Sequence, residues 1–315
     1  MNTKVRPGLV LSDTGAHFGT WENAFRRAAP DLTVVHDAPD RDLSGIRYCM
    51  TWKPQPGLYD RMPDLVALFA LGAGVDRFLG DETVPPQVQI VKMAEPGLTQ
   101  AMEHYVLWQV INHHRRFWEL EVAQREARWL DQSYPAPWER KVGVMGLGTL
   151  GEAVARLLAD FGFETRGWSR TRKAIDGVTV FSRAAQAEAF LDGLEVLVCL
   201  LPLTPETHGI LNADIFRHLA RGAGLINVGR GAQLNEADLL SALETGQLAA
   251  ASLDVFAAEP LPPAHPFWRH PRIFVTPHLA ADVDPVSSAH AIKRQIDRCE
   301  AGLPLEHVAE RNRGY

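Results

Sequence analysis

Three side chains with complementary chemistry follow successive apolar runs in the second half of the chain. Arg230 lies just past one run, Glu259 past the next and His278 past a third. If these runs are parallel strands of a doubly wound sheet, their carboxyl ends converge on one ligand crevice. We therefore expect a cation, a carboxylate and an imidazole to meet there.

This trio suits the reduction of a 2-keto acid. Such a reaction needs a cation for the substrate carboxylate, an acid that protonates the forming alkoxide, and a partner that keeps the acid charged. A carboxylate favours the charged form of a neighbouring imidazole. We assign Arg230 to the substrate, His278 to general acid catalysis and Glu259 to His278. Taken singly, each is also compatible with a surface charge, and His278 with a hydrogen-bonded core histidine.

A glycine-rich turn, G-L-G-T-L-G, follows the apolar run 141–145 and opens a helical pattern. Gly146 allows the tight turn, Gly148 allows a pyrophosphate to approach the backbone, and Gly151 allows helix and strand to pack closely. The helix N-terminus would then face the phosphates. The spacing predicts a dinucleotide site, and the alternative is a turn that serves packing alone.

A basic segment, W-S-R-T-R-K at residues 168–173, ends the next predicted strand. Dinucleotide-binding domains usually carry an acidic residue there, which accepts hydrogen bonds from the adenosine ribose. Here Ser169 takes that place, and Arg170, Arg172 and Lys173 follow. Because cations pair with a 2'-phosphate and an acid would repel it, we predict that the cofactor is NADP(H). The alternative is a solvated run of charges.

The elements that would position these residues form an α/β fold. Short apolar runs alternate with helical patterns, which is typical of parallel strands joined by crossover helices. The predicted strands are 8–11, 32–36, 46–51, 65–70 and 88–91 in a first series, and 141–145, 164–168, 195–200, 224–228, 249–254 and 273–276 in a second. One long amphipathic helix over 101–130 is expected to connect the two series, and the last helix covers about 285–300.

Composition restricts the class of protein. The chain has 315 residues, 46% of them hydrophobic and 22% charged, which suits about two well-packed domains. A net charge of -6 argues against a general nucleic-acid-binding protein. No apolar run approaches the roughly 18 residues of a membrane span, and none has the form of a signal peptide. Cys49, Cys199 and Cys299 lack metal-binding spacing, so we expect a cytoplasmic, reduced protein without a metal site. We expect Cys199 to be a small buried residue.

The motifs together resemble the D-isomer-specific 2-hydroxyacid dehydrogenases over nearly the whole chain. They are G-L-G-T-L-G, L-P-L-T-P-E-T (201–207), I-N-V-G-R-G (226–231), L-D-V-F-A-A-E-P-L-P (253–262) and T-P-H (276–278). Within that family, F-A-L-G-A-G-V-D (69–76), R-G-W-S-R-T-R-K (166–173) and E-P-L-P-P (259–263) are most similar to the NADPH-dependent glyoxylate/hydroxypyruvate reductase A group. The resemblance implies reduction of glyoxylate to glycolate and of hydroxypyruvate to D-glycerate.

The resemblance also implies two Rossmann-like domains with doubly wound parallel sheets and the active site between them. The NADP-binding domain, 101–284, is inserted into a discontinuous, flavodoxin-like substrate-binding domain formed by 1–100 plus 285–315. It further implies that backbone amides of Ala73, Gly74 and Val75 bind the substrate carboxylate, although this segment is also compatible with a plain glycine-rich turn. Trp52 is placed to cap that pocket.

The cofactor-binding residues that the resemblance implies are Gly146, Leu147, Gly148, Thr149, Leu150, Gly151, Ser169, Arg170, Arg172, Lys173, Leu201, Pro202, Thr207, Val228, Gly229, Asp254, His278 and Ala280. Trp129 and Trp138 lie in the loop 128–140, which takes part in dimer contacts in family members, so a homodimer is expected.

Other interpretations remain open at this point. The run His113-His114-Arg115-Arg116 is predicted to form a solvated helix face, because adjacent histidines on a helix point about 100° apart and make a poor metal site. The catalytic trio serves a different or bulkier 2-keto acid equally well. A protein of another class, a dinucleotide-sensing co-repressor that binds partners, could retain the same residues.

Overall fold

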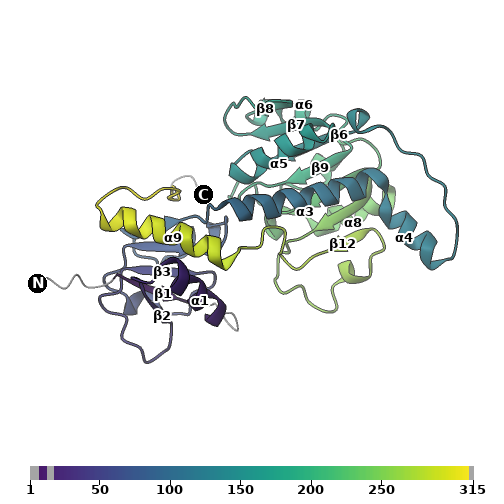
Figure 1. The fold of residues 1–315 in the computed structure, drawn as a ribbon. Helices are drawn as coiled ribbons and strands as arrows, with labels where there is room; N and C mark the ends of the chain where they lie inside the picture. The colour runs from purple at the N-terminus through teal and green to yellow at the C-terminus, as the bar shows by residue number, and fades with distance from the viewer. Residues whose placement is uncertain (1–6, 13–17, 312–315) are drawn as a thin grey trace, which may run out of the picture. The chain divides into compact units, whose positions relative to one another are not determined.

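The computed structural model describes residues 7–12 and 18–311. The chain divides into two compact units (Figure 1). Unit 1 is Met1–Leu98 with Asp282–Tyr315, and unit 2 is Thr99–Ala281. In the part of the chain that is described, no helix has both the length and the apolar character needed to cross a membrane.

Unit 1 is built on a five-stranded parallel sheet of order β2-β1-β3-β4-β5. Its strands are β1 (Gly8–Leu11), β2 (Thr33–His36), β3 (Tyr48–Thr51), β4 (Ala67–Ala70) and β5 (Gln89–Val91), and its helices are α1 (Phe18–Ala28), α2 (Asp76–Leu79) and α9 (Pro285–Glu300). All residues of β1, β3 and β4 are buried, as expected for strands covered on both faces. Helices α1 and α9 pack side by side, so the last helix completes a layer that the first one begins.

Unit 2 contains a seven-stranded parallel sheet of order β12-β11-β10-β9-β6-β7-β8. The strands are β6 (Lys141–Met145), β7 (Glu164–Ser169), β8 (Val178–Ser182), β9 (Val196–Cys199), β10 (Ala223–Asn227), β11 (Leu248–Leu253) and β12 (Ile273–Val275). Its helices are α3 (Pro96–Arg115), which begins in the last residues of unit 1, α4 (Phe117–Arg125), α5 (Thr149–Asp160), α6 (Ala187–Leu191), α7 (Ala213–Phe216) and α8 (Glu236–Thr245).

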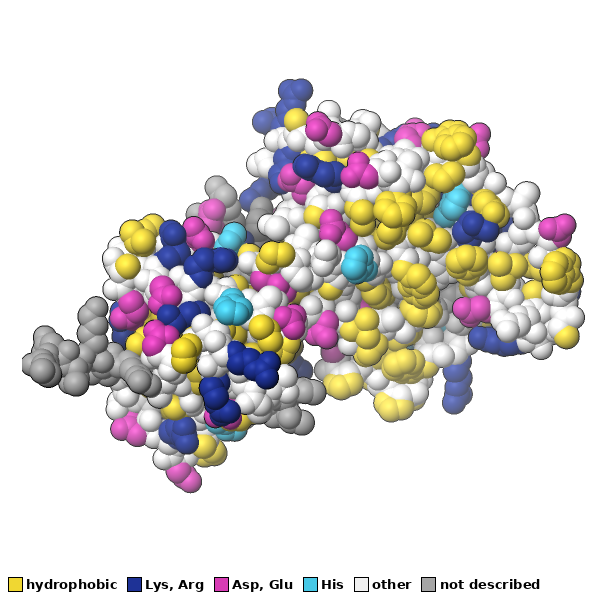
Figure 2. Space-filling view, in the orientation of Figure 1, with side chains coloured by type: hydrophobic (Ala, Val, Ile, Leu, Met, Phe, Trp, Pro, Cys, Tyr) yellow, Lys and Arg dark blue, Asp and Glu magenta, His cyan; other side chains and the backbone are white. Residues whose placement is uncertain are grey.

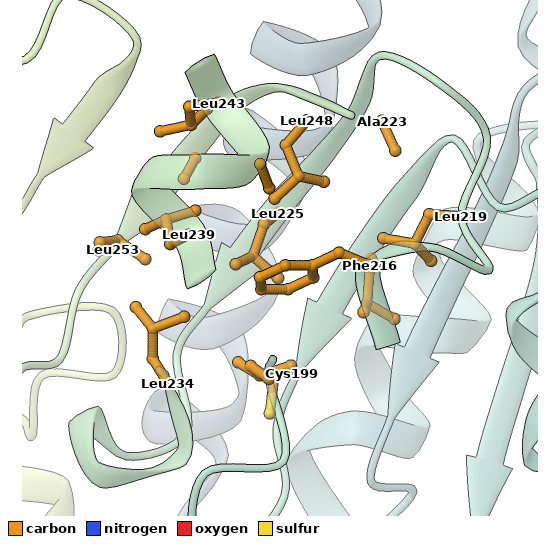
Figure 3. Packing of buried hydrophobic residues seen from close by; sticks show 14 of the residues in the cluster. Cys199, Phe216, Leu219, Ala223, Leu225, Leu234, Leu239, Leu243, Leu248 and Leu253 are labelled. Atoms are coloured by element: carbon orange, nitrogen blue, oxygen red, sulfur yellow. The ribbon is translucent and has the colours of Figure 1, made fainter. Parts of the chain in front are cut away.

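Each face of the unit 2 sheet has its own hydrophobic core. Along the central strand β9, Leu197 and Cys199 belong to one core, whereas Val196 and Val198 belong to the other. Figure 3 shows the first core, where Cys199 lies among leucines of α8 and the neighbouring strands. Cys199 is buried as expected, and its burial raises the pKa of the thiol to about 12. The two-sided burial confirms the predicted α/β class.

The connecting helix differs from the prediction of one helix over 101–130. Helix α3 ends at Arg115 and α4 begins at Phe117. Between them Arg116 has φ 53° and ψ 47°, in the left-handed region that a continuous α-helix cannot contain. Between Arg125 and the start of β6 at Lys141, the chain forms no further helix apart from a 3₁₀ turn at Pro137–Glu139. The amphipathic pattern continues across this break, and no glycine or proline in the sequence marks it. The pattern alone therefore predicts one continuous helix.

The prediction of a solvated face at residues 113–116 is wrong for both histidines. His113 is 6% exposed and His114 is 5% exposed. His113 lies three residues after Val110 and seven after Val106. It therefore continues the apolar stripe of α3 that packs on one face of the unit 2 sheet. Its Nε2 lies 3.0 Å from Oγ of Ser252, and burial lowers the pKa of His113 to about 4.

The strand β8 is a second difference, since its V-T-V-F-S sequence was not predicted as a strand.

Candidate active site

The parallel register brings the ends of six strands of unit 2 to one edge of the sheet. Trp168, Met145, Cys199, Asn227, Leu253 and Val275 pair with one another in that order across neighbouring strands. Each predicted functional segment of unit 2 begins within a few residues of this row. Since the strands end level, the segments that follow them lie at a common edge, where ligands bind in such sheets.

His278 and Glu259, which follow β12 and β11, form a hydrogen-bonded pair at this edge. His278 Nδ1 lies 2.8 Å from Oε2 of Glu259. An ionised carboxylate only accepts hydrogen bonds, so Nδ1 carries the proton and Nε2 is left for another partner. Burial raises the pKa of the Glu259 carboxyl, but hydrogen bonds from His278 and the Phe256 N–H, with the charges of His278 and Arg230, lower it further than burial raises it. Glu259 is therefore ionised at neutral pH.

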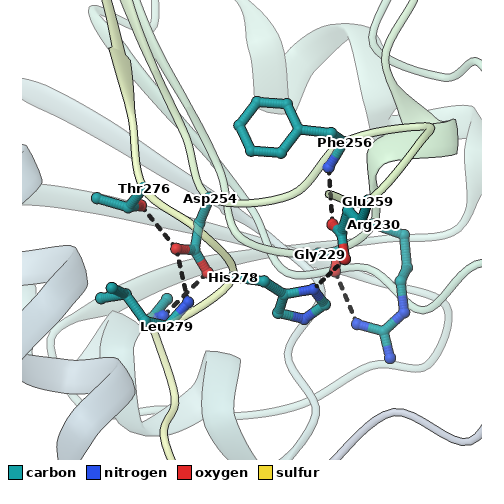
Figure 4. Close-up of polar contacts among 9 residues, drawn as sticks. Gly229, Arg230, Asp254, Phe256, Glu259, Thr276, His278 and Leu279 are labelled. Carbon is teal, nitrogen blue, oxygen red and sulfur yellow. Dashed lines mark hydrogen bonds and ion pairs between the residues drawn. The ribbon is translucent and has the colours of Figure 1, made fainter. Parts of the chain in front are cut away.

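Arg230 lies close to this pair, and its charge contributes to the lowered pKa of Glu259. Figure 4 shows the side chains of Arg230, Glu259 and His278 gathered at one place. The Arg230 Nη1 donates to the carbonyl of Gly229 at 2.9 Å. A Cβ atom on Gly231 would lie 1.8 Å from the carbonyl carbon of Phe256, so only glycine lets the Arg230 loop pass this close to the Glu259 loop. The structure thus brings the predicted trio together.

Asp254 fixes the segment that carries His278. Its Oδ1 accepts from Leu279 N and its Oδ2 from Ala280 N, both at 2.9 Å, while its carbonyl accepts from His278 N at 2.8 Å. The side chain of Thr276 donates to Oδ1 at 2.6 Å (Figure 4). Asp254 was predicted as a cofactor-binding residue. The structure shows it 1% exposed and hydrogen-bonded to the segment that carries His278.

The glycine-rich turn has the form that a dinucleotide requires. Gly146 has φ 98°, and a Cβ atom there would lie 2.7 Å from the carbonyl oxygen of Leu200. A Cβ atom on Gly151 would lie 1.8 Å from the Gly146 carbonyl oxygen, whereas one on Gly148 would meet nothing within 4 Å. The backbone at Gly148 is therefore open to a ligand at the N-terminus of α5, so Gly146, Leu147, Gly148, Thr149, Leu150 and Gly151 fit a bound pyrophosphate.

The basic segment begins beside this turn. The Gly146 N–H donates to the Trp168 carbonyl at 2.9 Å, so Ser169 lies next to the turn. The Ser169 hydroxyl donates to the Thr171 carbonyl at 2.6 Å, which makes a compact bend. Arg170 and Arg172 are exposed. Lys173 is engaged differently, because its Nζ lies 2.8 Å from Oε2 of Glu152 in the first turn of α5.

The loops after β9 and β10 are linked by a residue that the sequence did not reveal. The buried amide of Gln233 accepts from Arg230 N at 2.8 Å and donates to the carbonyls of Leu201 at 2.9 Å and Pro202 at 3.1 Å. Thr207 donates to the Pro202 carbonyl at 2.7 Å, and Val228 N to the Cys199 carbonyl at 3.1 Å. The predicted cofactor-binding residues of these loops thus share one hydrogen-bonded framework. Gln233 stands three residues after Arg230, a spacing that is informative only when the turn is known.

In unit 1 the predicted substrate residues lie at the end of neighbouring strands. Thr51 pairs with Ala70, so Trp52 and the segment Ala73-Gly74-Val75 follow adjacent strand ends. The ring of Trp52 packs on Gly72, where a Cβ atom would lie 3.3 Å from the indole. The guanidinium of Arg77 lies 5.2 Å from the Trp52 ring centroid. The indole is thereby held against the start of the glycine-rich segment.

Comparisons with known proteins point to one family. Residues 107–280 match the sequence profile of the D-isomer specific 2-hydroxyacid dehydrogenase, NAD binding domain. A glyoxylate/hydroxypyruvate reductase A from Serratia proteamaculans is 46% identical over 300 residues, which cover 94% of this chain and 96% of the relative. One of the same name from Yersinia enterocolitica is 42% identical over 279 residues, covering 87% and 89%.

Solved structures show the same fold. A D-isomer specific 2-hydroxyacid dehydrogenase from Xanthobacter autotrophicus, in complex with NADPH and MES, has a TM-score of 0.94 and 40% identity, covering 99% of this chain and 100% of that one. An NADPH-dependent glyoxylate/hydroxypyruvate reductase from Sinorhizobium meliloti, in complex with NADP and sulfate, has a TM-score of 0.93 and 41% identity with the same coverage.

Proposed function

The chain belongs to the D-isomer-specific 2-hydroxyacid dehydrogenase family, and on that premise we propose that it reduces small 2-keto acids with NADPH. Glyoxylate would give glycolate, and hydroxypyruvate would give D-glycerate. The names of the relatives support these substrates. The observation that carries the proposal is the 2.8 Å hydrogen bond between His278 Nδ1 and Glu259 beside the Arg230 guanidinium.

The side chains divide the chemical work. Arg230 binds the substrate carboxylate and orients the ketone. His278 donates a proton from Nε2 to the ketone oxygen as it becomes an alkoxide, since Nδ1 is bonded to Glu259. Glu259 stays ionised and stabilises the charged imidazole before that transfer. The bound nicotinamide would supply the hydride.

The cofactor is proposed to bind at the edge of the unit 2 sheet, so unit 2 is the NADP-binding domain. The turn Gly146–Gly151 would hold the pyrophosphate, and Ser169, Arg170 and Arg172 the 2'-phosphate. Lys173 would contribute its charge while paired with Glu152. The complexes of similar proteins with NADPH and NADP support this choice of cofactor. Leu201, Pro202, Thr207, Val228, Gly229, Asp254, His278 and Ala280 would line or support the same site.

Unit 1 is proposed to be the substrate-binding domain. The amides of Ala73, Gly74 and Val75 would bind the substrate carboxylate as an anion nest, because successive N–H groups in a bend of small residues point to one side. Trp52, packed on Gly72, would limit the size of the bound 2-keto acid. An alanine at Trp52 that did not alter the relative kcat/KM for small and bulky 2-keto acids would contradict this assignment.

The protein is proposed to act as a homodimer. The segment after α4 carries large exposed aromatic side chains, with Trp129 95% exposed and Trp138 72% exposed. Figure 2 shows hydrophobic side chains over the region where Figure 1 places α3, α4 and β12. Exposed apolar groups of this size are typical of protein interfaces. A monomer in light scattering at micromolar concentration would refute the dimer.

A cytoplasmic location is also proposed. Cys49, Cys199 and Cys299 are all free thiols, which suits a reducing compartment.

The direct test of the function is the oxidation of NADPH in the presence of a panel of 2-keto acids, followed at 340 nm. Glyoxylate and hydroxypyruvate should give the highest kcat/KM values among them. A higher value with a bulkier 2-keto acid would favour a dehydrogenase of different specificity. Binding of NADPH without turnover of any 2-keto acid would favour a co-repressor-like protein.

A further inference from the structure

A chain of side-chain hydrogen bonds connects helix α3 to the segment that carries His278. The hydroxyl of Tyr105, on α3, lies 2.6 Å from Oγ1 of Thr276. Thr276 Oγ1 in turn lies 2.6 Å from Oδ1 of Asp254. Both bonds lie within unit 2, so they are part of one compact body. The sequence motifs point to Thr276 and Asp254 but give no indication of Tyr105.

The direction of these hydrogen bonds follows from the number of protons. A threonine hydroxyl has a single proton, and Thr276 gives it to the Asp254 carboxylate. Tyr105 must therefore donate to the Thr276 oxygen. Burial is the main cause that raises the pKa of Tyr105 to about 12, so its hydroxyl is protonated at neutral pH. A hydroxyl that accepts a hydrogen bond becomes a better donor itself, so Tyr105 strengthens the bond from Thr276 to Asp254.

Asp254 transmits this restraint to the backbone of His278. Its carbonyl accepts from His278 N, and its carboxylate accepts from the N–H groups of Leu279 and Ala280. His278 itself has φ 55°, a left-handed conformation that is uncommon for a residue with a side chain. Such a conformation persists only where neighbouring contacts impose it. The hydrogen bonds of Asp254 impose it here, and they orient the imidazole toward Glu259.

We propose that Tyr105 is a positioning residue for the proton donor of the reaction, acting through Thr276 and Asp254 on the orientation of the His278 ring. This inference rests on the proposed function, in which His278 delivers the proton. Tyr105 contributes no atom to the transfer. Its hydroxyl makes the carboxylate of Asp254 a fixed acceptor, so that the His278 segment has one conformation.

The kinetic test compares Tyr105→Phe, Thr276→Val and the double variant, each in the full-length protein with NADPH and glyoxylate. Tyr105→Phe should lower kcat by about threefold to tenfold, the range expected for one lost hydrogen bond, with KM for NADPH unchanged. Thr276→Val should lower kcat at least as much, and Thr276→Ser should recover most of the loss. The double variant should match Thr276→Val alone, because Tyr105 acts through Thr276.

The matched control is Tyr59→Phe, which removes a buried tyrosine hydroxyl from the core of unit 1. It should leave kcat unchanged. Unchanged kcat in Tyr105→Phe, or equal losses from Tyr105→Phe with and without Thr276→Val, would overturn the inference.

A second measurement does not depend on turnover. The ring resonances of His278 in a protein labelled with ¹⁵N at histidine, assigned by their loss in His278→Ala, should shift in Tyr105→Phe and Thr276→Val but not in Tyr59→Phe. A His278 resonance that stays in place in both variants would overturn the inference whatever the kinetics show. Failure of the proposed function would give a different result, because the wild-type protein would then turn over no 2-keto acid.

Discussion

The ammonium group of Lys173 lies 2.8 Å from Oε2 of Glu152, so the last cation of the basic segment is paired with the first turn of α5. Glu152 stands close to the turn where the pyrophosphate is proposed to bind. An unpaired carboxylate at a helix N-terminus would compete with a phosphate for the same positive end of the dipole. The pair neutralises that charge. In the proposed complex, Arg170 and Arg172 would therefore make most of the contact with the 2'-phosphate.

Arg170→Asp should therefore reduce the preference for NADPH. Replacing a cation by an anion beside a phosphate removes an attraction and adds a repulsion, so the ratio of kcat/KM for NADPH to that for NADH should fall by at least about tenfold. Steady-state kinetics with both cofactors at saturating glyoxylate measure the ratio. The control is Arg217→Asp, at an exposed arginine that directly follows α7 and forms an ion pair with Asp214. A ratio unchanged in Arg170→Asp would rule out a share of Arg170 in selectivity.

His278→Ala should abolish most of the catalysis while the cofactor still binds. Loss of a positioned general acid typically costs about 10² to 10⁴ in kcat. The dissociation constant for NADPH, measured by fluorescence titration, should change by less than about twofold, because the substitution leaves the proposed phosphate-binding residues unchanged. Turnover near the wild-type value in this variant would refute the role of His278.

Glu259→Gln should make the stability of the protein less dependent on pH in the acid range. The pKa of Glu259 in the folded protein lies below its ordinary value of 4.5. The carboxylate therefore contributes stability above pH 4.5, and this contribution is lost as the pH falls through the lower folded-state pKa. Thermal unfolding measured between about pH 6 and about pH 3 should show a smaller fall in Tm for Glu259→Gln than for the wild type. A parallel fall in the two proteins would contradict the prediction. Glu188→Gln, at an exposed position in α6, is the control.

His113→Gln should weaken the pH dependence of stability in a different pH range. Burial lowers the pKa of His113 from 6.5 to about 4, so the unfolded chain takes up a proton at a higher pH than the folded one. Stability supplied by the neutral imidazole is present above pH 6.5 and declines as the pH falls toward about 4. The variant should have a lower Tm at pH 7.5 but a smaller decline across that window. His104→Gln, exposed on the same helix, should keep the wild-type slope, and a wild-type slope in His113→Gln would disprove the assignment.

The residues that the sequence predicted best lie a few residues past the end of a strand. Arg230, Glu259 and His278 could be placed together because a parallel sheet brings the carboxyl ends of its strands to one edge, whatever the details of packing. The turn Gly146–Gly151 was predictable for a similar reason, since its glycines answer local steric demands within one strand-turn-helix unit.

The features that escaped prediction depend on contacts between distant segments. His113 is buried because α3 packs on the sheet that contains Ser252, a residue 139 positions away in the chain. Gln233 and Tyr105 make side-chain hydrogen bonds to distant residues, such as Leu201 and Thr276, which no local pattern reveals. The break at Arg116 was missed for a local reason. Arg116 has a left-handed backbone conformation, which an arginine in the sequence does not indicate.

The pairing of α1 with α9 has a consequence for how the protein is made. The inner face of α1, with Trp21 and Phe25 buried, packs against a helix that begins only at Pro285. Tyr48 likewise bonds to Glu300, at 2.6 Å from its hydroxyl to the carboxylate. During translation the ribosome delivers all of unit 2 before it delivers α9. The apolar face of α1 therefore stays uncovered until the segment 285–300 has left the ribosome. Apolar surface exposed in this way during synthesis is prone to aggregation.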